Sequence, residues 1–99
     1  MALPYSPTNL RISDVTPTSV YLSWIYDGPI EDLRYFVIQY KAKDSNSNYE
    51  EISGVSTHFY TVTKLNPYTE YEFYVLAENH AGRGPPSVPA FMTTGETGD

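Results

Sequence analysis

The sequence predicts an all-β protein in which two antiparallel sheets pack as a sandwich, and three observations support this fold class. Short segments alternate polar with apolar residues, turn residues interrupt the chain about every eight to twelve residues, and no segment has helical periodicity. On this basis we expect seven short strands. A chain of 99 residues has room for one hydrophobic core and therefore forms one domain.

The stretch 65–77 carries the clearest strand signal. Pro67 cannot donate to a sheet ladder, so the chain bends there before the strand begins. We expect Leu65 before the bend and Tyr71 after it to lie in the core, with the Tyr71 hydroxyl bonded to a nearby carbonyl, an arrangement known as a tyrosine corner. The inward residues of the strand itself are predicted to be Tyr71, Phe73 and Val75.

Six further segments complete the predicted strands, namely 10–12, 20–24, 33–41, 50–52, 58–63 and 87–94. Among them, the inward positions are predicted to include Trp24, Phe36, Ile38 and Tyr40. Pro89 indicates that the last strand lies at a sheet edge. Residues 1–6 are interpreted as a leader or linker, 7–94 as the domain and 95–99 as a linker.

Composition excludes several classes of partner and chemistry. The net charge is −6, with acidic residues scattered along the chain, so binding to nucleic acid or to an acidic membrane surface is not expected. No apolar run approaches the roughly 20 residues of a membrane span, and residues 1–4 do not form a signal peptide. The absence of cysteine excludes disulfides and thiolate metal sites. We therefore expect the domain to fold without metal or cofactor and to be monomeric, since its net charge opposes self-association.

The residues that could carry catalysis do not form a recognisable constellation. His58 heads a predicted strand and His80 lies in a predicted loop. The adjacent acids 31–32 and 50–51 would point to opposite sides of an extended chain, which does not suit an acid–base pair or a metal site. The segment 82–86 lacks the lysine and the following helix of a phosphate-binding loop. We predict that the domain is not an enzyme, and any measured turnover would favour the alternative of a free-standing enzyme.

Several segments together resemble a fibronectin type III domain. They are Pro7 with Leu10, then 19–24, 36–40, and Leu65-Asn66-Pro67 with Tyr71. The resemblance covers roughly 7–94 and implies a seven-stranded antiparallel immunoglobulin-like sandwich. It implies packing roles for Trp24, Tyr40, Leu65 and Tyr71, and no chemistry.

A finer resemblance lies in the segments 37–41, 51–55, 69–73 and 82–87. These are similar to the first fibronectin repeat of LAR-type receptor tyrosine phosphatases. The resemblance implies an extracellular position in a single-pass plasma-membrane receptor, preceded by immunoglobulin domains and followed by further fibronectin repeats. It implies roles in cell adhesion, axon guidance and synapse formation, with neighbouring domains and a cell-surface adhesion protein as partners. Phosphatase chemistry would reside in intracellular domains, because it needs a cysteine that this chain lacks.

Two alternatives to this interpretation remain open. Muscle-type giant proteins also use cysteine-poor fibronectin repeats as intracellular structural units, and other adhesion receptors contain such repeats. The sequence that flanks the domain would separate these classes.

The sequence offers two competing sites for contact with a partner. Four outward positions on the third and sixth predicted strands are unusually apolar and would form one patch: Tyr35, Val37, Tyr74 and Leu76. The alternative is that these side chains only stabilise cross-strand pairs. The second site is the loop 79–86, where Arg83 would lie exposed at a hairpin tip near an adjoining domain. This loop contains Arg83-Gly84 but has Pro85 where an integrin-binding loop has aspartate.

Overall fold

The residue types explain why this chain forms strands. β-branched and aromatic residues alternate with polar ones, and successive side chains of a strand point to opposite faces, so each segment can bury one face. The computed structural model describes residues 2–46 and 48–95. The regular secondary structure assigned within these residues consists of strands only. The strands are β1 (Thr8–Ser13), β2 (Val20–Ile25), β3 (Leu33–Ala42), β4 (Glu50–Val55), β5 (Phe59–Val62), β6 (Glu70–Asn79), β7 (Gly82–Arg83) and β8 (Ala90–Thr93).

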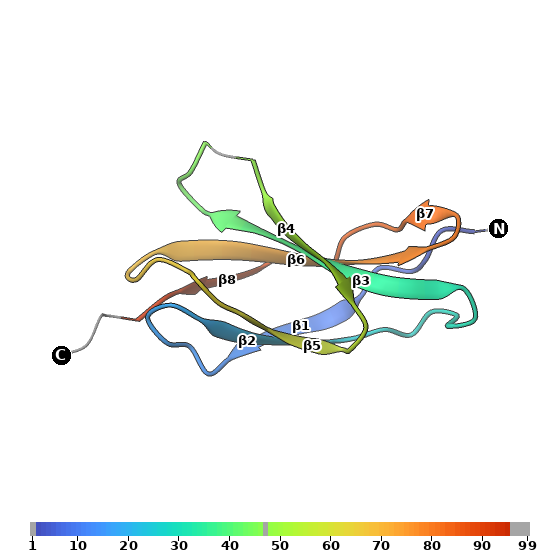
Figure 1. Cartoon of the computed structure of the whole chain (residues 1–99), viewed down its shortest axis with the longest axis horizontal. Helices are drawn as coiled ribbons and strands as arrows, with labels where there is room; N and C mark the ends of the chain where they lie inside the picture. The colour runs from blue at the N-terminus through green and yellow to red at the C-terminus, as the bar shows by residue number, and fades with distance from the viewer. Residues whose placement is uncertain (1, 47, 96–99) are drawn as a thin grey trace.

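These strands form two antiparallel sheets that pack face to face (Figure 1). The three-stranded sheet has the order β1-β2-β5. The five-stranded sheet has the order β4-β3-β6-β7, and β8 also pairs with β6. The predicted sandwich of two antiparallel sheets is thereby confirmed.

The core lies between the two sheets and centres on the ring of Phe36. Three rings contact it edge-on, with centroid distances of 5.5 Å for Trp24, 5.6 Å for Tyr26 and 5.2 Å for His58. Tyr40, predicted to be a core residue, is only partly buried and packs against the rest of the core. The other residues predicted for the core are buried, namely Trp24, Phe36, Ile38, Leu65, Tyr71, Phe73 and Val75.

The bend before β6 is held by two hydroxyl groups. The Tyr71 hydroxyl accepts a hydrogen bond from the backbone N–H of Asn66 at 2.8 Å. The buried Thr94 hydroxyl donates to the Asn66 carbonyl at 2.6 Å and accepts from the Thr69 N–H at 2.9 Å. The tyrosine corner is therefore present, but the partner of Tyr71 is an amide donor rather than the carbonyl that we predicted.

The number of strands differs from the prediction, because the predicted loop 79–86 contains the short strand β7, while the last predicted strand, 87–94, is shortened to β8. The segment 84–89 contains three prolines, which have no N–H to donate to a ladder. It nevertheless stays beside β6, since Gly84 N–H donates to the Ala77 carbonyl at 2.9 Å and Ser87 N–H donates to the Val75 carbonyl at 2.8 Å. The described residues therefore form eight strands instead of the seven predicted, with β7 inside the predicted loop 79–86.

Residues 2–6, interpreted from the sequence as a leader or linker, pack against the β6–β7 hairpin. Pro4 is buried, and the Ala2 carbonyl accepts a hydrogen bond from Asn79 Nδ2 at 2.9 Å. At the other end of the 51 Å long molecule, Gly95 N–H donates to the Thr16 carbonyl at 3.2 Å (Figure 1). The rest of the predicted linker, 96–99, lies outside the described residues.

The contribution of the Tyr71 hydroxyl to stability can be tested by removing it. In Tyr71→Phe, the Asn66 N–H loses the acceptor of a part-buried hydrogen bond while the ring stays in place, so the free energy of unfolding should fall by about 1–2 kcal/mol. Urea unfolding measures this difference. The matched control is Tyr60→Phe, which removes a hydroxyl from an exposed ring and should change stability little. Equal stability of Tyr71→Phe and the parent chain would contradict the structural role of the corner.

Candidate protein-interaction face

The outer face of the five-stranded sheet gathers the polar and aromatic side chains that the core does not use. The register of β3 against β6 sets these side chains in rows, pairing Tyr35 with Glu78, Val37 with Leu76, and Gln39 with Tyr74. Arg83 on β7 pairs with Glu78 in the first of these rows. The structure thus brings all five residues predicted as partner contacts onto one face, which we call the outer face: Tyr35, Val37, Tyr74, Leu76 and Arg83.

A single arginine connects the two edges of this face. Strands β3 and β6 separate β4 from β7, yet Arg83 on β7 donates to Glu51 on β4 from Nη1 at 2.8 Å and from Nη2 at 3.0 Å. Arg83 Nε also donates to Glu78 at 3.3 Å, and Gln39 donates to Glu51 at 2.9 Å. Two parallel hydrogen bonds between guanidinium and carboxylate are geometrically specific and strong for a surface pair. We call the Arg83–Glu51 contact the cross-sheet bridge.

Two of the four residues predicted to form an exposed apolar patch are buried beneath the outer face. Val37 and Leu76 point outward, but their exposed fractions are 0% and 6%. In the register, the Val37–Leu76 row lies between the row of Arg83 and the row of Glu51, so the line of the bridge passes over this pair. The hydrocarbon part of an arginine can cover apolar surface while its head remains in water. The prediction was therefore wrong for Val37 and Leu76, whereas Tyr35 and Tyr74 are partly exposed.

Arg83 is exposed, as predicted, but it does not lie at the tip of the hairpin. The tip of the hairpin is formed by residues 80–81, and Arg83 lies beyond the tip in the β7 ladder. Its side chain extends back over the sheet to Glu78 and Glu51. Arg83 therefore lies on the same face as the four residues of the predicted patch.

The bridge changes the protonation behaviour of its members. The Arg83 guanidinium, and after it the Gln39 amide, lowers the pKa of Glu51 to about 2. The same hydrogen bonds to Glu51, followed by the one to Glu78, raise the pKa of Arg83 above its ordinary value. The hydroxyl of Tyr35 donates to Glu78 at 2.9 Å, and this hydrogen bond is the main cause that raises the pKa of Tyr35. Because the pKa of Glu51 is low, the Arg83–Glu51 ion pair remains charged well into the acidic pH range.

Sequence reasoning missed a second cluster on the outer face. Tyr49 packs edge-on against Tyr74 at 5.8 Å, carries the Lys41 ammonium over its ring at 4.8 Å, and donates a hydrogen bond to Glu72. That hydrogen bond is the main cause that raises the pKa of Tyr49. The sequence does contain a signal for the position of Tyr49. Side chains of a strand alternate between its two faces, so an inward Ile52 places Glu51 and Tyr49 on the outward side.

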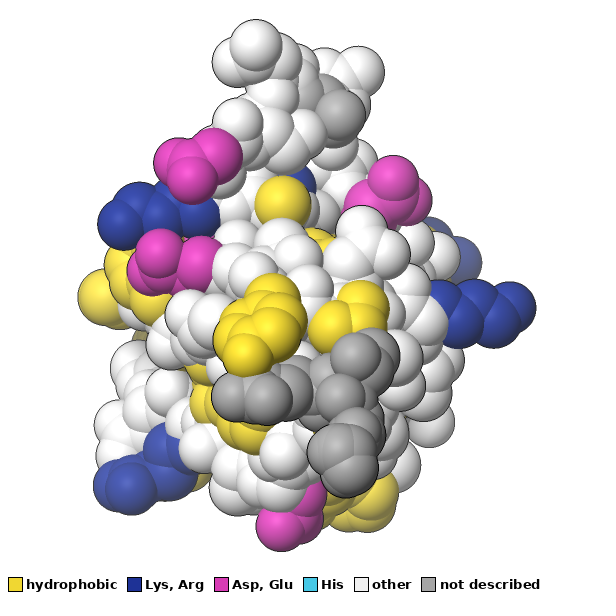
Figure 2. Space-filling model, turned by 90° about the vertical axis from the view of Figure 1, so that its left-hand side faces the viewer, with side chains coloured by type: hydrophobic (Ala, Val, Ile, Leu, Met, Phe, Trp, Pro, Cys, Tyr) yellow, Lys and Arg dark blue, Asp and Glu magenta, His cyan; other side chains and the backbone are white. Residues whose placement is uncertain are grey.

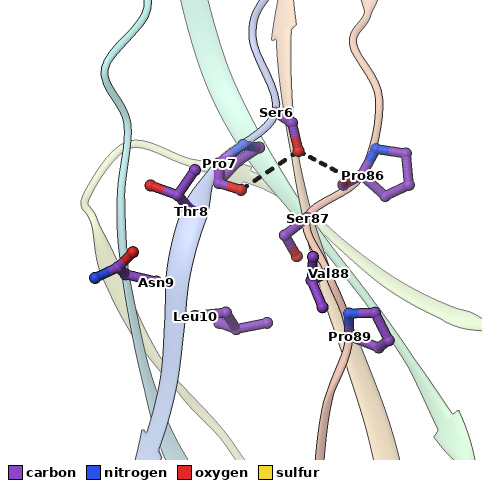
Figure 3. Close-up of a pocket in the computed structure, with 9 residues that line it drawn as sticks. All are labelled: Ser6, Pro7, Thr8, Asn9, Leu10, Pro86, Ser87, Val88 and Pro89. Atoms are coloured by element: carbon purple, nitrogen blue, oxygen red, sulfur yellow. Dashed lines mark hydrogen bonds between the residues drawn. The ribbon is translucent and has the colours of Figure 1, made fainter.

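A groove elsewhere on the molecule has no titratable side chain in its lining. It encloses about 450 Å³ between the start of β1 and the segment 86–89, and Figure 3 shows the Ser6 hydroxyl donating to the Pro86 carbonyl at 2.7 Å across it. Its lining is Ser6, Pro7, Thr8, Asn9, Leu10, Pro86, Ser87, Val88 and Pro89. None of these side chains is a carboxylate, imidazole or amine, so the groove offers no group for acid–base chemistry.

Other features that could mark a site are limited in the described part of the chain. Residues 2–46 and 48–95 hold no group of three or more His, Cys, Asp or Glu side chains placed to bind a metal ion. Within the same residues, no helix has the length and apolar character needed to cross a membrane. Figure 2 views the end of the sandwich where the C-terminal segment lies, and there acidic and basic side chains are interspersed around the rim. The described residues at this end therefore form no continuous basic surface of the kind that binds nucleic acid.

Comparison with known proteins defines the class to which this sandwich belongs. The family described as "Fibronectin type III domain" matches residues 5–93. The chain belongs to this family. Fibronectin type III domains are non-catalytic modules, so this domain is not an enzyme.

The relatives narrow the class further. The chain is 62% identical over 96 residues to tyrosine-protein phosphatase Lar of Drosophila melanogaster, and 50% identical over 95 residues to receptor-type tyrosine-protein phosphatase F of Danio rerio. These alignments cover 97% and 96% of the chain but only 5% of each relative. Among solved structures, domains A168–A170 of titin match with a TM-score of 0.83 and 28% identity, covering 95% of this chain and 33% of that one. The similarity to LAR-type receptor phosphatases predicted from the sequence is confirmed.

The lowered pKa of Glu51 generates a prediction about acid stability. The ordinary pKa of a glutamate in an unfolded chain is about 4.3, and the folded value lies below it. The stabilisation by the bridge is therefore complete above about pH 4.3 and is lost as the pH falls toward 2. Because both partners are partly exposed, we expect a contribution below about 1 kcal/mol.

Thermal unfolding between pH 6 and pH 2 tests this expectation. The melting temperature of the parent chain should fall more steeply over this interval than that of Glu51→Gln, which cannot lose a charge. The control Glu31→Gln removes an exposed carboxylate and should leave the slope unchanged. Parallel curves for the parent chain and Glu51→Gln would show that the bridge does not stabilise the fold.

A second prediction separates the charge of Arg83 from its covering of the apolar pair. Arg83→Ala removes both and should lower the free energy of unfolding by about 1 kcal/mol. Arg83→Met removes the charge but keeps an apolar chain over Val37 and Leu76, so it should lose clearly less. Urea unfolding at neutral pH compares the two variants. If Arg83→Met is as destabilised as Arg83→Ala, the arginine contributes through its charge alone.

Proposed function

We propose that this chain is an extracellular fibronectin type III module that acts as a spacer and a protein-interaction unit in a LAR-type cell-surface adhesion receptor. In such a receptor it stands as the first fibronectin repeat, with neighbouring immunoglobulin and fibronectin domains in the same chain. It contributes there to cell adhesion, axon guidance and synapse formation. The observation that carries the proposal is 62% identity to Drosophila Lar over nearly the whole chain.

The shape of the domain supports the spacer role. The segments that lead into β1 and out of β8 lie at opposite ends of a molecule that measures 51 × 26 × 19 Å (Figure 1). Domains joined at such ends extend one after another, so each adds length to the array. A spacer of this kind needs no catalytic group.

The outer face supports the interaction role. Tyr35, Tyr49 and Tyr74 stand on it among charged side chains, with Arg83 between two carboxylates. Tyrosine and arginine are enriched in protein–protein interfaces, because each combines a large contact area with directed hydrogen bonds. We therefore assign the contact with an adhesion protein to this face.

The alternative of an intracellular structural repeat has a weaker basis. The titin domains share the fold with this chain at a TM-score of 0.83, but their identity to it is 28%, less than half of the 62% shared with Lar. A common sandwich supports many functions, so the sequence similarity carries more weight than the shape.

Location is the first test of the proposal. An epitope tag inserted in the loop between β3 and β4 of the full-length parent protein should be stained by antibody on intact cells. Staining that requires permeabilised cells would overturn the extracellular assignment and favour an intracellular repeat.

Adhesion is the second test and addresses the outer face. In the full-length protein, Tyr49→Ser combined with Tyr74→Ser should reduce adhesion to partner cells severalfold. The matched control is Phe59→Ser, which removes an exposed ring from the other sheet and should leave adhesion unchanged. Surface expression and melting temperature are measured for each variant. Equal adhesion by folded outer-face and control variants would contradict the assignment of the contact to this face.

A further inference from the structure

The N-terminal end of the sandwich contains a small hollow that the proposed function does not use. It encloses about 150 Å³ between residues 2–5, the turn after β2 and Asn79. Its apolar walls include Leu3, Tyr5, Tyr26 and Pro29, and its lining also contains the acidic residues Glu31 and Asp32. Both acidic residues are exposed.

Residues 2–6 are held in a fixed position beside this hollow. The carbonyl of Ala2 accepts from Asn79 Nδ2 at 2.9 Å, and the other end of that amide, Oδ1, accepts from the Ala81 N–H at 2.8 Å. The carbonyl oxygen of Pro4 lies so close to Gly84 that a Cβ there would be 2.3 Å away. Glycine is therefore required at position 84, and the segment packs as part of the domain.

Three large apolar side chains at this end remain in contact with solvent. Leu3, Tyr5 and Ile30 expose 51%, 57% and 68% of their surfaces. Leu3 and Tyr5 line the hollow directly, and Ile30 lies between two residues that line it, Pro29 and Glu31. Exposed apolar side chains gathered beside acidic ones are typical of a surface that another protein covers.

The chemistry of the hollow selects one kind of side chain. Apolar walls fit the aliphatic stem of lysine or arginine, and carboxylates at the opening fit the charged head. The exposed ring of Tyr5 offers a face that attracts a cation, and its centroid lies 6.5 Å from that of the buried Tyr26 ring. A volume of about 150 Å³ has room for one such side chain.

We propose that this hollow binds a lysine or arginine side chain of the domain that precedes residue 2 in the parent protein, and so fixes the angle between the two domains. The inference rests on the proposed function, since it requires a multidomain parent. The relatives are about twenty times longer than this chain, which covers 5% of their length. Ala2 lines the hollow, so a domain joined before it in a multidomain parent would begin beside this hollow. A basic residue there would complement the two carboxylates.

The 99-residue chain can be tested directly with a small probe. Titration with N-acetyl-arginine amide, followed by ¹H–¹⁵N NMR, should give saturable shifts at the amides of Leu3, Tyr5, Asp32 and Asn79. N-acetyl-norleucine amide, which has a similar stem without the charge, should bind about tenfold more weakly. Equal shifts by the two probes, or shifts that do not saturate, would overturn the proposal.

Matched variants separate the hollow from the general negative charge of the domain. Glu31→Gln with Asp32→Asn should weaken binding of the arginine probe about tenfold. The control pair, Asp14→Asn with Asp44→Asn, removes the same two charges at exposed positions elsewhere and should leave binding unchanged. Equal weakening by both pairs would show non-specific attraction only and would overturn the proposal.

The link to a neighbouring domain needs a longer piece of the parent protein. In a chain extended by its own preceding domain, ¹⁵N relaxation should give one common tumbling time for both domains, and Glu31→Gln with Asp32→Asn should make the two times diverge. Independent tumbling of the unsubstituted pair would overturn the docking inference but leave the spacer function intact. Intracellular staining of the full-length parent would overturn the proposed function without affecting the probe result.

Discussion

The pairing of β3 with β6 is the constraint on which both faces of the larger sheet depend. It runs from Leu33 opposite Asn79 to Ala42 opposite Tyr71, and it is the longest ladder of the fold. Its inner side supplies Phe36 and Phe73 to the core, and its outer side sets the rows over which the cross-sheet bridge lies. If β6 paired with β3 one residue out of register, its inward and outward side chains would change places. Carboxylates of β6 would then point into the core. The apolar inner row therefore fixes the geometry of the outer face, although the two lie on opposite sides of the sheet.

Much of the fold could be predicted from the sequence, because the side of a strand on which a residue lies follows from its position in the alternation. That rule placed Trp24 and Phe73 inside. It also placed Val37 and Leu76 outward, but it cannot show what covers an outward side chain. Here the Arg83–Glu51 bridge, whose arginine is 46 positions after Val37 in the sequence, crosses the sheet from β7 to β4 along the line of this pair. Such a contact depends on the order of the strands in the sheet and on side-chain conformation. The alternation of residues along one strand gives information on neither.

The same limit explains the other differences. The position of the proline-rich segment 84–89 beside β6 depends on two backbone hydrogen bonds. The docking of residues 2–6 depends on Asn79, whose amide connects that segment to a turn formed much later in the chain. Tyr49 was overlooked because it lies one residue before β4, where alternation is too short to be convincing. Long-range polar contacts, which bring together the candidate site, are thus the part of the structure that pattern reasoning predicts least well.

The placement of residues 2–6 has a mechanical consequence. When the flanking chain is under tension, force enters at Ala2 and leaves beyond Gly95, at the opposite end of the sandwich. The first contact along the path of the load is the hydrogen bond between Ala2 and Asn79, followed by the packing of Pro4 on Gly84 and the hydrogen bond from the Tyr5 N–H to the Tyr26 hydroxyl. The ladder between β1 and β2 resists in shear, with its hydrogen bonds loaded together. The segment therefore forms a short extensible element in series with a stiffer body, which lengthens under weak pulling before the sandwich itself is strained.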